Sequence, residues 1–87
     1  MTNTQLLKLV SKILGNPKDV DFKVLKKLLD GFGFECRQPR GGGSHYIFRK
    51  TGSAPITVPK KKPVNTTYVK QVIRLLDLED WYEKNKR

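Results

Sequence analysis

The spacing of hydrophobic residues changes twice along this 87-residue chain, and this change limits the folds that the chain can adopt. In residues 4–14 and 22–30, apolar side chains recur with the spacing of one face of an α-helix. Residues 34–38, 45–50 and 55–59 instead read as strands, rich in aromatic and β-branched residues. Helical spacing returns at residues 67–76. This order predicts an α+β domain with a three-stranded antiparallel meander.

The ends of the predicted helices carry recognisable signals. Gly15 and Pro17 predict that the first helix ends in a left-handed cap followed by a residue that cannot continue it. Asp21 is placed to cap the second helix through its side chain, and Asn65 or Thr66 is placed to cap the helix at 67–76.

Three strands leave both faces of a sheet exposed unless helices cover one of them. We therefore expect the two helices that flank the meander to pack on the same face. Residues 1–16 then form an amphipathic helical extension that either enlarges the core or serves a partner, and residues 17–87 form the domain proper. At the C-terminus, the sequence LEDWYEKNKR predicts a short turn in which Leu78, Trp81 and Tyr82 pack back on the domain.

Length and composition exclude several classes of protein. One small domain is the default for this length, and no apolar run approaches the roughly 18 residues that cross a bilayer. Lysines at positions 8 and 12 interrupt the N-terminal apolar stretch, which is therefore not expected to be a signal peptide. The single cysteine, Cys36, allows no internal disulfide, so we expect a cytoplasmic protein.

The formal net charge is +10, and the positive charge is concentrated in one part of the chain. No acidic residue lies between Cys36 and Leu76, whereas that window contains nine basic residues. They are Arg37, Arg40, Arg49, Lys50, Lys60, Lys61, Lys62, Lys70 and Arg74. Such a block is costly through self-repulsion unless a polyanion neutralises it. Nucleic acid is the first candidate partner, ahead of an anionic membrane surface.

Two loops in the basic window are candidate phosphate sites. The segment PKKKP holds Lys60, Lys61 and Lys62 between two prolines, just before a helix N-terminus whose free N–H groups favour phosphate. The segment PRGGGS contributes Arg40 and glycines that let backbone approach a phosphate, although glycines alone equally suit a flexible connection. No nucleotide-triphosphate motif is present.

His45, the only histidine, follows this glycine-rich segment directly. A lone histidine is more often structural than catalytic, and one imidazole with one distant cysteine does not make a zinc site. Beside a basic surface that holds RNA, however, an imidazole can take the proton from a ribose 2′-OH, and the alkoxide can attack the adjacent phosphorus. Lysines and arginines such as Arg49 would stabilise the developing charge, so no cofactor is expected. Tyr46, Ser44 or a lysine could protonate the leaving oxygen.

Residues 20–76 resemble the HicA toxin family of bacterial toxin–antitoxin pairs. The resemblance rests on the GSH motif ahead of an apolar strand, here Gly43, Ser44 and His45, on the Gly-Phe before the first strand, and on the Val-Pro that ends the third. It implies a fold like that of double-stranded-RNA-binding domains, with α-β-β-β-α order. It also implies a ribonuclease that acts on messenger RNA through His45, and a HicB-like antitoxin that covers the active site.

Two other functions remain open from the residues alone. A non-catalytic module that binds double-stranded RNA suits the same fold order and the same basic loop, because such modules bind by shape and phosphate contacts. A small interaction subunit could instead use the amphipathic N-terminal helix as its working part.

Overall fold

The computed structural model describes residues 2–38 and 44–86. The elements in chain order are α1 (Asn3–Gly15), α2 (Phe22–Gly31), β1 (Glu35–Arg37), β2 (His45–Arg49), β3 (Ile56–Pro59), α3 (Thr66–Leu75) and α4 (Leu78–Asn85). The strands form one antiparallel sheet in the order β1-β2-β3, which confirms the predicted meander and makes β2 central.

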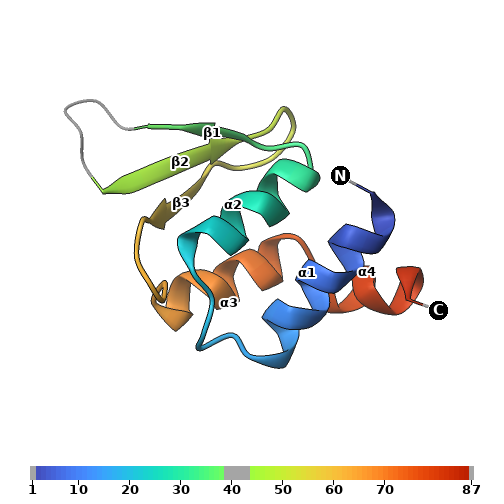
Figure 1. Ribbon diagram of the computed structural model, residues 1–87. Helices are drawn as coiled ribbons and strands as arrows, with labels where there is room; N and C mark the ends of the chain where they lie inside the picture. The colour runs from blue at the N-terminus through green and yellow to red at the C-terminus, as the bar shows by residue number, and fades with distance from the viewer. Residues whose placement is uncertain (1, 39–43, 87) are drawn as a thin grey trace.

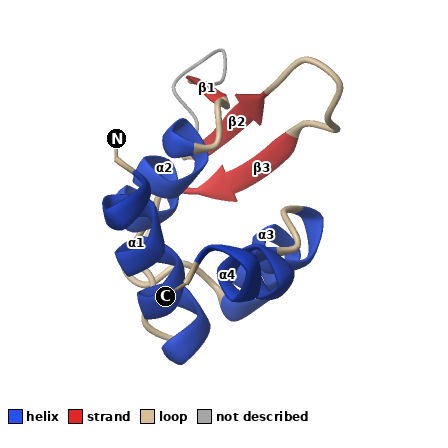
Figure 2. Cartoon of the chain, turned by 90° about the vertical axis from the view of Figure 1, so that its right-hand side faces the viewer, coloured by secondary structure: helices blue, strands red, loops and turns tan. Residues whose placement is uncertain are grey.

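The molecule has two layers, with the sheet on one side and the helices gathered on the other (Figure 1 and Figure 2). Both views place α2 and α3 against the same face of the sheet, as expected from the sequence. The elements α2 to α3 give the α-β-β-β-α order of a double-stranded-RNA-binding-domain-like fold, and α1 and α4 are added before and after it. The predicted α+β class is confirmed.

The start of α1 is well defined and its end differs from the prediction. Thr2 and Gln5 form a capping box, in which each side chain accepts a hydrogen bond from the other residue's backbone N–H. Gly15 is still helical, and the capping residue is Asn16, with φ −151°. The predicted left-handed cap at Gly15 is therefore wrong. The Asn16 N–H bonds to the Lys12 carbonyl, so the helix ends without the left-handed turn that glycine would favour.

The other two predicted caps have different outcomes. Asp21 is the N-cap residue of α2, but its side chain makes no capping hydrogen bond, so that prediction is wrong. Its backbone carbonyl instead accepts from the amides of the first turn. Asn65 caps α3 through its side-chain oxygen, which lies 2.9 Å from the amide nitrogen of Thr67.

The hydrophobic core lies between the sheet and the helices. Phe48 of the central strand is fully buried, and Ile56 and Val58 of β3 pair with β2 residues on the same face. Val10 and Ile13 of α1 are also fully buried in this core. The first helix therefore enlarges the core, one of the two roles that the sequence left open. The division of the chain at residues 16 and 17 remains a prediction.

The C-terminal segment is more regular than predicted, because it forms the eight-residue helix α4. Leu78 is fully buried, and the Trp81 ring meets Phe32 edge-on at 5.3 Å, so the predicted packing onto the domain is confirmed. Asp77 adopts a left-handed conformation with φ 49°, which reverses the chain between α3 and α4. That conformation is uncommon for a residue other than glycine, and the sequence carries no glycine to signal it. Within the described residues, no helix is long and apolar enough to span a membrane.

Candidate nucleic-acid interface

The register of the central strand places His45 on the open face of the sheet. Successive side chains of a strand point to opposite faces. Tyr46 and Phe48 point toward the helices, where their rings lie 4.9 and 6.1 Å from the ring of Phe22. His45 and Ile47 therefore point the other way, and His45 is solvent-exposed. The imidazole is available to a ligand and is not part of the core.

Backbone pairing brings the lysine-bearing loop next to this histidine. His45 is paired with Pro59 across the β2–β3 ladder. One residue further on, the Lys60 amide donates to the Ser44 carbonyl, with the nitrogen and oxygen 2.7 Å apart. The residues that the sequence predicted as separate loops, Ser44 and Lys60, are thus neighbours at the end of the sheet that carries His45.

The lysine loop is also tied to the start of α2. The Phe22 amide donates to the Lys61 carbonyl at 3.1 Å, and the Val64 amide donates to the Val20 carbonyl at 2.8 Å. Figure 1 shows the result: the start of β2, the end of β3 and the N-termini of α2 and α3 all lie at the left-hand end of the molecule. The loop is therefore positioned by hydrogen bonds as well as by the prolines that the sequence indicated.

The loop lysines have no acidic partner among the described residues. Four ion pairs occur there, and three of them join neighbours on α2, within α4 or just past its end. The fourth joins Arg37 to Glu35 at 3.8 Å between highly exposed side chains, so it contributes little. Lys60, Lys61 and Lys62 make none of these pairs and are exposed. Their charges are free to bind phosphate.

The other predicted RNA-binding residues fall into two groups. Arg49 shares the open face with His45, but it lies four positions further along the strand, about 13 Å at the usual rise. The structure therefore does not bring Arg49 to the immediate surroundings of the imidazole. Arg40 and Gly43 lie outside the described residues.

Arg37 is a candidate that the sequence interpretation did not select. It pairs with Ile47 and so lies on the open face, diagonal to His45 on the neighbouring strand. Diagonal neighbours lie within reach of a long side chain. The alternation of FECRQ signalled that Arg37 and Cys36 face opposite ways, but only the strand register shows which of them shares a face with His45.

Lys50, by contrast, serves the fold. Its ammonium group donates to the Phe32 carbonyl at 2.7 Å and lies 5.6 Å from the centroid of the Phe34 ring. Lys50 therefore fastens the end of β2 to the segment that joins α2 to β1. The positive charge of Lys50, although part of the basic window, therefore stabilises the fold. Composition alone could not indicate this role.

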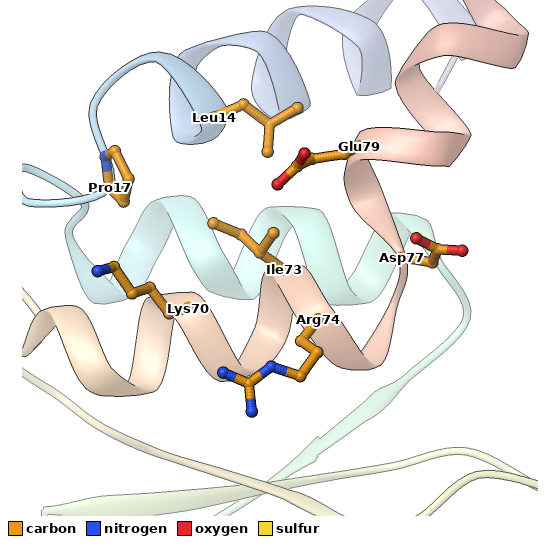
Figure 3. A pocket seen from close by; sticks show the side chains of 7 residues that line it. All are labelled: Leu14, Pro17, Lys70, Ile73, Arg74, Asp77 and Glu79. Carbon is orange, nitrogen blue, oxygen red and sulfur yellow. The ribbon is translucent and has the colours of Figure 1, made fainter.

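Two hollows in the surface are relevant to ligand binding. One of about 500 Å³ lies between α1, α3 and α4, and Figure 3 shows its mixed lining of apolar, basic and acidic side chains. It contains none of the predicted site residues. A smaller hollow of about 260 Å³ is lined by Phe22, Lys23 and the three loop lysines, so it adjoins Ser44 and the His45 end of the sheet. In the part of the chain that the structure describes, no three His, Cys, Asp or Glu side chains gather as a metal site.

These features define a small α+β protein with an open sheet face, an exposed histidine and an adjoining cluster of exposed lysines. The model of the family described as "HicA toxin of bacterial toxin-antitoxin" matches residues 22–78. The match covers more than half of the chain, which therefore belongs to the HicA toxin family. The protein is the toxin of a toxin–antitoxin system, and its partner is an antitoxin. Neither curated proteins nor solved structures gave a significant match.

The matched segment begins at the first residue of α2 and ends at the first residue of α4. It contains the whole sheet, the lysine loop and His45. Helix α1 and nearly all of α4 lie outside it, and these two helices pack together on the side of the molecule away from the sheet (Figure 1).

Proposed function

We propose that this toxin is an endoribonuclease that cleaves messenger RNA without a metal ion, with His45 as the general base. The observation that carries the proposal is the pairing of an exposed imidazole on the open sheet face with a lysine loop anchored one residue away. The basic window supports a polyanionic substrate, and membership of a toxin family supports a destructive activity that a partner must restrain.

The reaction that suits these groups is transfer of the phosphorus from one ribose oxygen to another. His45 removes the proton of a 2′-OH, and the 2′ oxygen forms a bond to the adjacent phosphorus. The bond from phosphorus to the 5′ oxygen breaks, and that oxygen takes a proton from a general acid. The products are a 2′,3′-cyclic phosphate and a free 5′-OH. Lys60, Lys61 and Lys62 would offset the negative charge that builds up on the phosphoryl oxygens.

The packing narrows the choice of general acid. Tyr46, one of the three groups that the sequence offered, lies against Phe22 on the face opposite to His45, so it is poorly placed for the same phosphate. Ser44 and Lys60 are joined by a hydrogen bond beside His45 and remain the better candidates. Of these, the Lys60 ammonium also carries the charge that the transition state needs.

The antitoxin is proposed to be HicB-like and to cover the same surface. Carboxylates on the partner would pair with the loop lysines that find no acid within the described residues, and complementary charge would speed the encounter. Such an arrangement blocks the phosphate sites and His45 together. Messenger RNA and the antitoxin would then meet the toxin in the cytoplasm.

The chemistry of the cleaved ends tests this proposal. Purified toxin, freed of antitoxin, is incubated with a synthetic RNA in buffer containing EDTA, and the fragments are analysed by mass spectrometry. The proposal expects cleavage with 2′,3′-cyclic phosphate and 5′-OH ends, and none at a position carrying a 2′-deoxyribose. Cleavage that stops with EDTA, or that leaves 5′-phosphate ends, would refute the mechanism. Tight binding of duplex RNA with no cleavage of any RNA would favour the non-catalytic module.

A further inference from the structure

The smaller hollow brings aromatic and basic side chains together. Its lining comprises Phe22, Lys23 and the lysines at positions 60–62, so one aromatic residue and four lysines meet there, and the lining is mainly apolar. Phe22 is only 6% exposed, and its ring packs against the rings of Tyr46 and Phe48. The floor is therefore rigid, and the methylene stems of the lysines extend it outward.

The chemistry of this lining favours one class of ligand. A free phosphate would use the ammonium groups but gain nothing from the apolar floor. An apolar ligand would leave the charges of the four lysines without a partner. A nucleotide satisfies both, because its base has a flat apolar face and its phosphate is anionic. The volume, about 260 Å³, suits a single base better than a paired one.

The hollow lies close to His45, where the phosphodiester bond would be cut. Lys60 lines the hollow and is hydrogen-bonded to Ser44, which directly precedes His45. His45 faces the open side of the sheet, whereas Phe22 lies under it. An RNA strand in contact with both must pass around the end of β2. On such a path, the bases of two neighbouring nucleotides lie on different sides of the sheet. At least one of the two bases must then be unpaired.

We propose that the hollow formed by Phe22, Lys23 and the lysines at 60–62 is a nucleotide-binding subsite, which holds the unpaired base next to the scissile phosphate. This proposal rests on the proposed nuclease function for the identity of the neighbouring site. The proposal assigns a role in ligand binding to Lys23, which lies outside the basic window of the sequence. The base enters against Phe22, and its phosphate is held between Lys23 and Lys60.

Binding of small probes tests the subsite without any cleavage. The full-length toxin is titrated by NMR with AMP, ribose 5-phosphate and inorganic phosphate at matched ionic strength. These probes share a phosphate, and only AMP carries a base. We expect AMP to bind about fivefold or more tightly than ribose 5-phosphate, since only its base can bury apolar surface against the floor of the hollow, and to shift the resonances of Phe22 and Lys23. Equal binding of the two phosphate esters, or shifts elsewhere on the molecule, would overturn the proposal.

Two matched variants sharpen the experiment. Lys23→Gln and Lys27→Gln remove the same charge from exposed positions on α2, but Lys27 does not line the hollow. Lys23→Gln is expected to weaken AMP binding about threefold or more and to raise KM for RNA with little change in kcat, while Lys27→Gln leaves both near wild type. Equal effects of the two variants would mean that only general positive charge matters, and would refute the subsite. If AMP binds as expected but no RNA is cut, the subsite stands and the nuclease proposal fails.

Discussion

Replacement of Ile13 by alanine tests whether α1 belongs to the core of the domain. Ile13 is fully buried, and α1 packs against α2 and α4. Ile→Ala at such a site costs about 2–5 kcal/mol, through lost apolar contact and the cavity left behind. A domain of this size has a free energy of unfolding of about 4–13 kcal/mol. The substitution therefore removes a large share of the stability, although Ile13 lies outside the segment matched by the family.

The assay is equilibrium unfolding in guanidinium chloride followed by circular dichroism. With a slope of about 2 kcal/mol per molar for a small domain, the midpoint should fall by roughly 1–2.5 M. Lys12→Ala, one position away and exposed, is the control and should stay within about 0.5 kcal/mol of wild type. An unchanged midpoint for Ile13→Ala, or a separate early transition for α1 alone, would refute the conclusion that the first helix and the sheet share one core.

Three further predictions concern single residues. Arg37→Ala should weaken RNA binding several-fold and reduce the slope of log K against log salt by about 1, measured by fluorescence anisotropy; an unchanged slope would remove Arg37 from the interface. Burial raises the pKa of the Cys36 thiol, so the reactive thiolate appears only at higher pH than for free cysteine. Alkylation by iodoacetamide near pH 8 should accordingly be slower than for a free cysteine, and an equal or faster rate would contradict this. Asp77→Val should cost about 1–2 kcal/mol, because a β-branched residue resists the left-handed conformation, and an unchanged melting temperature would count against that account.

The secondary structure was largely predictable because it depends on local pattern. The switch from helical to strand spacing located every strand and three of the four helices, since each element buries one face in the core. The predictions that failed concern the ends of helices, where the Asp21 side chain makes no capping hydrogen bond. Gly15 signalled a left-handed cap that the chain does not use there, and Asp77 adopts that conformation with no glycine to indicate it. Local sequence allows several ways to end a helix, and tertiary packing selects among them.

The candidate site was predictable in its parts but not in its arrangement. His45 and the loop lysines were identified from chemistry and charge, whereas their proximity depends on the β2–β3 register. The same register adds Arg37 to the open face and separates Arg49 from the imidazole. Neither the commitment of Lys50 to the fold nor the proximity of Lys23 to the loop could be found from the sequence, because both depend on contacts between segments far apart in the chain.

The most direct test of the central claim compares His45→Ala with the wild-type toxin on one RNA. Single-turnover cleavage gives the rate, and a matching RNA with 2′-deoxyribose at the cut position gives the affinity without cleavage. Loss of a general base typically slows a reaction by about 10²–10⁴-fold, so we expect a rate loss in this range with a dissociation constant within about threefold of wild type. A variant that still cuts at the wild-type rate, or that loses affinity as much as rate, would contradict the role of His45 as the base.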